Sequence, residues 1–212
     1  KSWRRKEQKA RKRHACPTCV LLVIGDASEP VKRTADWLEG GNARMDFRLA
    51  NKQDLPPLKT MYRQIVNHMN DQGIPIWDDI YPSEFLAEDI ERQRLYVLLE
   101  NGEIVSAFAL CDANAGEGAV QWKENGAKAL YIDRLGVNVR YAKKGIGSRM
   151  LAKAAELAKA FGVAYLRLFV VDSNEPAIRL YEKIGFAKAV GIYEEAFDDG
   201  FTLREYGYEI KV

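Results

Sequence analysis

Residues 135–148 read LGVNVRYAKKGIGS, and this stretch decides the fold because a strand runs directly into a glycine loop that opens a helix. The apolar residues of 130–139 predict the strand, and Gly145 and Gly147 mark the loop. Apolar residues then recur at helical spacing until Gly162, at positions Ile146, Met150, Leu151, Ala154, Leu157, Ala158 and Phe161. The stretch therefore predicts a strand, a loop and a helix in succession.

The loop has the composition of an anion site. A helix that begins here exposes unpaired backbone N–H groups at the positive end of its dipole, and glycine lets the backbone approach a phosphate. Ser148 adds a hydroxyl donor, and Lys143 and Lys144 add positive charge. Many helices begin at glycine and exposed lysines are common, so the loop alone is weak support. Neither a P-loop pattern nor a dinucleotide-binding glycine pattern occurs in it.

Upstream of this stretch, the patterns predict one strand, two helices and a hairpin. In chain order these are a strand from Met45, a helix capped by Asp54 and closed by Gly73, a shorter helix capped by Ser83, and strands 95–100 and 103–111. Asn101 and Gly102 join the two hairpin strands, and this dipeptide favours a type I′ turn, which needs positive φ at both residues. We therefore expect the first part of the domain to form a sheet that contains this antiparallel hairpin.

Downstream, the pattern alternates between strand and helix. After the predicted loop 112–126 and the central stretch, we expect a strand at 164–171, a helix at 174–184 capped by Gly185, and strands 186–193 and 202–212 around a turn at Asp198, Asp199 and Gly200. An antiparallel hairpin followed by a helical crossover predicts a mixed α/β or α+β domain with one core.

Composition separates a basic leader from a mildly acidic body. The 212 residues carry 32 basic and 30 acidic side chains, a net charge of +2, yet residues 1–14 alone carry +7. The longest apolar run, residues 19–24, is far shorter than the roughly 20 residues of a membrane helix. We therefore expect one soluble, cytoplasmic domain, present as a monomer or homodimer, with no membrane partner.

Residues 1–44 are expected to be peripheral, as a flexible or non-native leader, with the domain spanning residues 45–212. A secretory signal is disfavoured because the apolar region is short and no clean cleavage site follows. A nucleic-acid-binding arm is disfavoured because few aromatic residues are interleaved with the charges. Cys16 and Cys19 have zinc-like spacing, but only His14, His68 and Cys111 remain as further ligands, so no metal site is expected.

Three separated motifs resemble the GNAT family of N-acetyltransferases. They are residues 135–139, residues 144–148 and residues 172–186, which read DSNEPAIRLYEKIGF. The resemblance covers residues 45–212 in element order and is sharpest from Leu130 to Phe186. It implies a single α/β (α+β) domain with a mixed, mostly antiparallel sheet of about seven strands and helices on both faces. The fourth and fifth strands, residues 130–139 and 164–171, would splay apart around the cofactor.

The resemblance also implies the site. Acetyl-CoA would lie between the splayed strands as co-substrate, with no metal. Its pyrophosphate would sit on Lys143, Lys144, Gly145, Ile146, Gly147 and Ser148, and its pantetheine arm on the backbone of Leu135, Gly136 and Val137. Tyr181 would protonate the thiolate, and Asn174 would contact the cofactor near the thioester. Tyr181 also fits a packed aromatic residue, and Asn174 fits a helix N-cap.

The sequence departs from the family pattern at two positions. Ala142 stands where the loop often begins with Arg or Gln. Phe169 stands where members that acetylate protein N-termini tend to carry a Glu that acts as the general base. The general base is therefore open between Asp133, Glu84 and a water chain. Strand alternation places Tyr131, Asp133, Leu135 and Val137 on one face, and Asp133 equally fits a structural ion pair with Arg134.

The resemblance implies that the loop between the first two helices and the last hairpin frame the acceptor. Trp77, Asp78, Asp79 and Tyr81 combine carboxylates with aromatic faces, which suits a small cationic amine. Alternatively, Trp77 and Tyr81 only pin the loop while the acids are solvated. The sequence thus predicts transfer of an acetyl group from acetyl-CoA to a small amine. A protein-amine acetyltransferase and a non-catalytic acyl-CoA-binding regulatory domain remain as alternatives.

Overall fold

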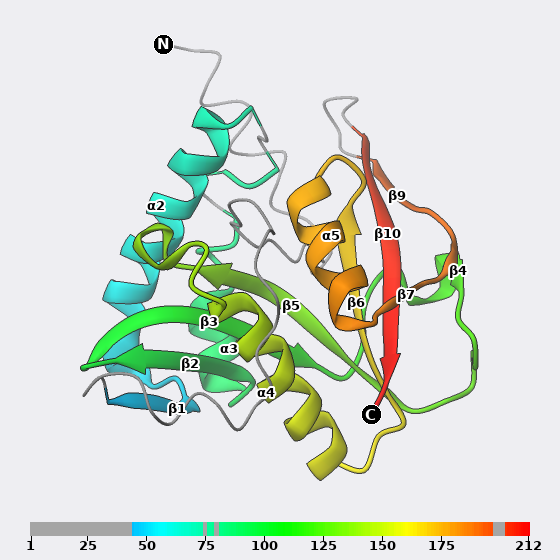
Figure 1. The fold of residues 1–212 in the computed structure, drawn as a ribbon, viewed down its shortest axis with the longest axis horizontal. Coiled ribbons are helices and arrows are strands. Elements are labelled where there is room, and N and C mark those ends of the chain that lie inside the picture. Colours follow the sequence, from blue (N-terminus) through cyan, green and yellow to red (C-terminus); the bar gives the residue numbers. More distant parts are fainter. Residues whose placement is uncertain (1–43, 74–75, 79–80, 197–201) are drawn as a thin grey trace.

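A computed structural model describes residues 44–73, 76–78, 81–196 and 202–212 (Figure 1). Within these residues the main sheet has eight strands in the order β1-β2-β3-β5-β6-β10-β7, with β9 paired to β10. Their bounds are β1 Met45–Leu49, β2 Leu95–Glu100, β3 Glu103–Cys111, β5 Ala129–Val137, β6 Tyr165–Val171, β7 Ala187–Lys188, β9 Tyr193–Ala196 and β10 Thr202–Lys211. Only β5 and β6 pair in parallel among them. The mixed, mostly antiparallel sheet expected from the sequence is confirmed.

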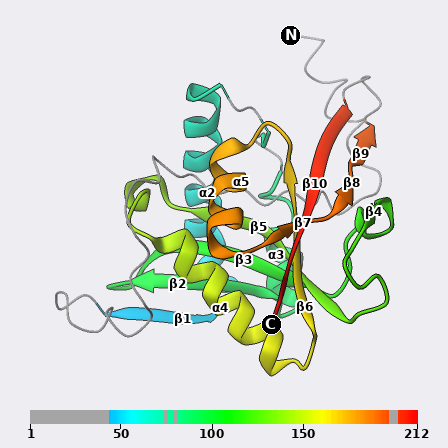
Figure 2. The same cartoon turned by 45° about the vertical axis from the view of Figure 1, so that its right-hand side comes forward.

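Helices cover both faces of this sheet, as expected (Figures 1 and 2). One core packs α2 (Leu55–Asp71) and α3 (Leu86–Glu91) against one face, and a second core packs α4 (Ile146–Ala160) and α5 (Glu175–Ile184) against the other. We call these the α2/α3 face and the α4/α5 face. Helix α4 is the crossover that makes β5 and β6 parallel.

Asp54 stands at the predicted N-cap position of α2 but does not cap it with its side chain, and Ser83 does not cap α3. Helix α2 follows Asp54, but the Asp54 side chain makes no cap hydrogen bond, because it accepts from Arg48 and from the backbone N–H of Asn51. Asn51 instead caps the preceding 3-10 turn, Lys52–Asp54. Helix α3 begins only at Leu86, and turns occupy Ser83 and its neighbours.

Two further segments differ from expectation. The predicted strand 186–193 is broken into β7, β8 (Val190–Gly191) and the start of β9, and β8 pairs with β4 (Val120–Gln121) inside the predicted loop 112–126. This loop is anchored to the sheet through Arg167, whose guanidinium pairs with Glu209 at 3.2 Å and donates to the carbonyl oxygen of Glu124 at 2.9 Å. The turn at Asp198, Asp199 and Gly200 lies outside the described residues.

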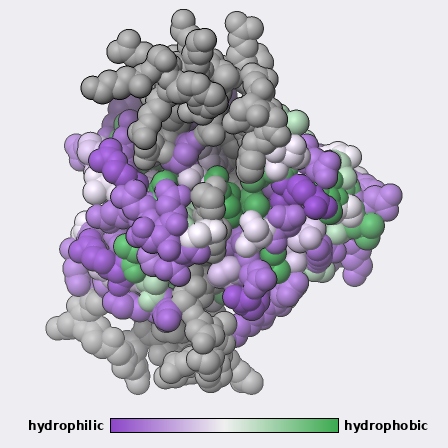
Figure 3. Space-filling model, turned by 90° about the horizontal axis from the view of Figure 1, so that it is seen from above, coloured by the Kyte–Doolittle hydropathy of each residue, from purple (hydrophilic) through white to green (hydrophobic). Residues whose placement is uncertain are grey.

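The Asn101-Gly102 turn is confirmed, with φ of 52° and 86° at its two central residues. The described surface seen from above is mostly hydrophilic, with apolar residues gathered between hydrophilic areas (Figure 3). None of the helices in the described part of the chain is long and apolar enough to cross a membrane.

Candidate active site

The sheet opens between β5 and β6, where the sequence predicted a splay. The two strands pair from Ala129 with Tyr165 up to Ile132 with Leu168. Beyond that point β5 continues alongside β3, with Val137 opposite Ser106, and β6 continues alongside β10, with Val171 opposite Glu205. The carboxyl ends of two parallel strands therefore diverge, which is where ligands of open α/β sheets bind.

A β-bulge lies at the start of this splay. Between β3 residues 107 and 109 and β5 residues 133 and 136, the register slips by one residue, so β5 carries one extra residue. Arg134 adopts a positive φ of 53° within this bulge. The backbone, rather than simple alternation, thus decides which way the following side chains face.

The bulge corrects the expectation that Tyr131, Asp133, Leu135 and Val137 share one face. Tyr131 belongs to the core of the α2/α3 face, whereas Leu135 and Val137 belong to the core of the α4/α5 face. A strand with an extra residue reverses the alternation beyond that residue. The backbone of Leu135, Gly136 and Val137 nevertheless lies beyond the last β5–β6 pair, along the splay.

The glycine loop provides an exposed helix N-terminus. Helix α4 begins after Gly145, which has a left-handed φ of 73°, and no side chain caps its first turn. Ile146 and Gly147 are buried, Ser148 is half-buried, and Lys143 and Lys144 are exposed. The Lys144 ammonium lies 4.7 Å from the centre of the Tyr141 ring, so it is held at the loop by a cation–π contact. These features fit an anion.

Helix α5 follows β6. Asn174 is the N-cap residue of this helix, and Tyr181 lies within it. Asn174 is 1% exposed, and its Oδ1 caps the helix by accepting from Ala177 N at 3.3 Å. Its buried Nδ2 has no hydrogen-bond partner among the described residues. Asn174 is thus a helix cap with one donor left over for a ligand. Tyr181 is fully buried, and its ring contacts those of Phe186 and Tyr208.

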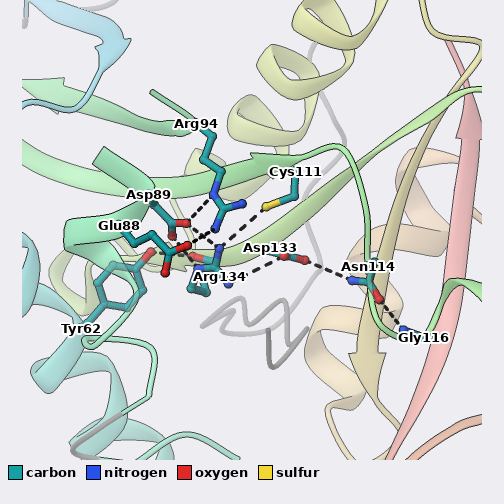
Figure 4. Close-up of polar contacts among 9 residues, drawn as sticks. All are labelled: Tyr62, Glu88, Asp89, Arg94, Cys111, Asn114, Gly116, Asp133 and Arg134. Atoms are coloured by element: carbon teal, nitrogen blue, oxygen red, sulfur yellow. Dashed lines mark hydrogen bonds and ion pairs between the residues drawn. The ribbon is translucent and has the colours of Figure 1, made fainter. Parts of the chain in front are cut away.

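Asp133 lies in a buried polar network, one residue beyond the part of β5 that pairs with β6 (Figure 4). Its Oδ2 is 3.7 Å from Arg134 Nη1, and its Oδ1 accepts from Asn114 Nδ2 at 3.3 Å. The ion pair with Arg134 that the sequence left open is therefore present. Glu84, the other candidate side chain, is exposed in the turn before α3.

Arg134 connects this network to two helices. It pairs with Asp89 of α3, and its carbonyl oxygen accepts from the Tyr62 hydroxyl of α2 at 2.5 Å. Burial raises the pKa of that hydroxyl well above its ordinary value. The ion pair of Arg134 with Asp89 and the hydrogen bond from Tyr62 were not expected from the sequence. The signal that could have found them is the Asp133-Arg134 pair, since two adjacent charges are unusual inside an apolar strand.

The acceptor loop is only partly described. Trp77 is 2% exposed and its ring contacts those of Tyr62 and Tyr81, so these aromatic residues do pin the loop. Asp78 is half-buried and its Oδ1 accepts from Tyr81 N at 2.8 Å, which closes a local turn. Asp79 lies outside the described residues. In the described ranges no three His, Cys, Asp or Glu side chains group as metal ligands would.

A sheet splayed beside an uncapped helix N-terminus is the architecture of the N-acetyltransferases. The model of the Acetyltransferase (GNAT) family matches residues 62–186, more than half of the chain, and the chain belongs to this family. It is therefore an enzyme of the acetyltransferase class.

Individual relatives agree with this assignment. YwnH of Bacillus subtilis (strain 168) is 27% identical over 145 residues, which is 68% of this chain and 85% of that protein. A thialysine N-epsilon-acetyltransferase of Bos taurus is 38% identical over 64 residues, 30% of this chain and 36% of that enzyme. The structure of yncA from Salmonella typhimurium with its cofactor acetyl-CoA superimposes with a TM-score of 0.58 and 18% identity, covering 79% of this chain and 94% of that one. The last likeness concerns the fold alone.

Proposed function

We propose that this enzyme transfers the acetyl group of acetyl-CoA to a primary amine of a small, cationic acceptor. The observation that carries the proposal is the buried, unpartnered Asn174 Nδ2 beside the splay of β5 and β6. The uncapped first turn of α4, with Lys143 and Lys144 close by, fits a pyrophosphate. The residues present therefore fit acetyl-CoA, which supplies an acyl group activated as a thioester.

Each protein group has a defined task in this proposal. The loop from Lys143 to Ser148 holds the pyrophosphate, and the backbone of residues 135–137 orients the pantetheine arm. Asp133 accepts the proton that the amine loses as its nitrogen bonds to the acyl carbon. Tyr181 delivers a proton from its hydroxyl to the sulfur that leaves. The geometry supports Asp133 in this task because Arg134 favours its ionised form.

A cationic amine is favoured at the loop that carries Trp77, Asp78, Asp79 and Tyr81. Carboxylates beside aromatic rings attract a cation through charge and through the ring faces. The thialysine acetyltransferase of Bos taurus is named for a small amine acceptor, which supports the same substrate class. A protein amine or a non-catalytic acyl-CoA-binding role are the competing possibilities.

A thiol-release assay with acetyl-CoA tests the proposal. The acceptor panel contains polyamines, aminoglycosides, amino acids and peptides. We expect turnover with at least one small cationic amine. Turnover on peptides alone would make the enzyme a protein acetyltransferase, and acetyl-CoA binding without thiol release on any acceptor would favour the non-catalytic role.

Substitution of the acceptor loop tests the charge of the substrate. Asp78→Asn keeps an oxygen for the hydrogen bond from Tyr81 N, so it removes the charge without opening the turn. Together with Asp79→Asn it should raise the KM for a cationic amine by about tenfold, because the amine loses its ion pair with the loop. The KM for acetyl-CoA is the internal control, and an unchanged amine KM contradicts the assignment.

A further inference from the structure

The Asp89–Arg134 ion pair joins α3 to β5 inside the protein (Figure 4). Both side chains are fully buried. Arg134 Nε donates to Asp89 Oδ2 at 2.8 Å, and Arg134 Nη2 donates to Asp89 Oδ1 at 3.0 Å. A buried ion pair is weak support for stability, because the loss of hydration offsets much of the attraction between the charges. Its position therefore calls for another explanation.

The pair holds a strained piece of backbone. Arg134 is the positive-φ residue of the β5 bulge, a conformation that residues with a side chain rarely adopt. Asp89 accepts hydrogen bonds from the Arg134 guanidinium, and the Tyr62 hydroxyl donates to the Arg134 carbonyl oxygen. The guanidinium also lies 5.4 Å from the centre of the Phe85 ring. Contacts from α2, α3 and the turn before α3 thus fix the bulge.

The bulge in turn orients Asp133. Because Arg134 adds a residue to β5, its guanidinium lies on the α2/α3 face next to the Asp133 carboxylate, 3.7 Å away. Asn114 Nδ2 donates to the other carboxylate oxygen, and Asn114 Oδ1 is itself held by Gly116 N at 2.9 Å. Asp133 is therefore held from two sides at the point where β5 leaves β6.

We infer that Arg134, held by Asp89, is a positioning residue for acetyl transfer that fixes the β5 bulge and keeps the Asp133 carboxylate oriented and ionised at the start of the splay. This inference rests on the proposed function, in which Asp133 accepts the amine proton. The charged and titratable groups near the Asp133–Arg134 pair include Asp89, Glu88, Arg94, Cys111 and Tyr62. Arg94 Nε donates to Asp89 Oδ1 at 2.7 Å, and the Cys111 thiol lies 3.8 Å from Arg134 Nη2.

The test compares this ion pair with a second buried pair on the same sheet. Arg167 and Glu209 are 1% and 5% exposed, pair at 3.2 Å, and lie where β5 and β6 are still joined. Arg134→Met, Arg134→Lys and Asp89→Asn are measured against Arg167→Met and Glu209→Gln. Each variant is assayed for melting temperature, kcat, both KM values and the pH profile of kcat/KM.

We expect Arg134→Met and Asp89→Asn to lower kcat by about tenfold or more relative to control variants of equal melting temperature. In Arg134→Met the acidic limb of the pH profile moves to higher pH, because the cation that favours ionised Asp133 is gone. Arg134→Lys keeps that cation, so it lowers kcat with a smaller movement of the limb. If Arg134→Met does not fold, the isosteric Asp89→Asn and the charge-preserving Arg134→Lys carry the comparison.

The result that overturns the inference is an equal loss of kcat in both sets of variants, with an unchanged acidic limb. This outcome differs from failure of the proposed function. In that case the wild-type enzyme itself would release no thiol with any small cationic amine of the panel, and no variant would be needed to see it.

Discussion

Tyr181 belongs to the core, and in the proposed function its hydroxyl also delivers a proton. Its ring packs against Phe186 and Tyr208 on the α4/α5 face. The neighbouring Tyr208 hydroxyl donates to Glu182 at 2.9 Å. Burial and this hydrogen bond raise the pKa of Tyr208 well above its ordinary value. Removing a single hydroxyl therefore separates packing from proton transfer.

Tyr181→Phe should lower kcat by about 100-fold or more, the usual contribution of a general acid, because the ring stays and only the proton donor is lost. The melting temperature should change little. Tyr208→Phe removes a hydroxyl from the neighbouring ring and is the matched control. Thiol release under saturating acetyl-CoA measures both, and equal rates for the two variants would reduce Tyr181 to a packed aromatic residue.

Asp54 carries the second prediction at this scale. The hydrogen bonds from Arg48, at 2.7 and 2.9 Å, hold the pKa of the Asp54 carboxyl below its ordinary value. A depressed folded-state pKa stabilises the protein above the unfolded-state pKa of about 4, and this contribution disappears as pH falls through the folded-state value. Arg48 is partly exposed, so we expect the pair to contribute about 1 kcal/mol to the free energy of unfolding.

Asp54→Asn should therefore destabilise the protein at pH 7 and should destabilise it less at pH 3. Urea unfolding at the two pH values measures the difference. Asp46→Asn removes an exposed carboxylate that lies 3.8 Å from the same guanidinium, and it serves as the control. A loss of stability that is the same at both pH values would contradict the role of the Arg48–Asp54 pair.

At the scale of elements, β5 carries most of the proposed site. One end of it pairs with β6, its middle holds the bulge, and its far end leads into the loop before α4. Gly136 lies just after the bulge, against α2. A Cβ at this position would come within 2.8 Å of Tyr62 Cε1 and 3.0 Å of Ile65 Cδ1. Both neighbours are fully buried, so neither can easily move away.

Gly136→Ala should cost about 1–3 kcal/mol of unfolding free energy, the usual range for overpacking. It should also weaken acetyl-CoA binding, because β5 must shift to make room. Gly118→Ala is the control, since nothing lies within 4 Å of its added Cβ. Thermal unfolding and an acetyl-CoA titration report the two effects, and wild-type values for Gly136→Ala would show that α2 yields instead.

For the whole molecule, two cores on the two faces of one sheet hold the described elements together. The described part begins at Arg44, whose backbone N–H and C=O bond the Asn101 side chain and backbone at 3.1 and 2.9 Å. From Met45 onward β1 pairs with β2 along its whole length. Among the described residues sheet pairing thus starts at Met45, and residues 45–212 as the folding unit stay a prediction.

A chain that lacks residues 1–43 should keep its melting temperature within a few degrees and its kcat on a small amine. The reason is that the described sheet, the two described cores and the proposed site are built from residues after Arg44. Calorimetry and the thiol-release assay compare it with the full chain. A large fall in melting temperature would assign residues 1–43 to the fold, and a loss of activity restricted to peptide acceptors would favour a docking arm.

Local patterns in the sequence determined the element order, the Asn101-Gly102 turn, the glycine loop before α4 and the family, because each depends on residues close together in the chain. The tertiary structure alone decided the β5 bulge, which moves Leu135 and Val137 to the α4/α5 face, and the pairing of Arg134 with Asp89. A bulge arises from the register between two strands, and Asp89 lies 45 residues from its partner. No periodic pattern in the sequence predicts the bulge or the ion pair, since both depend on which elements the folded chain brings into contact.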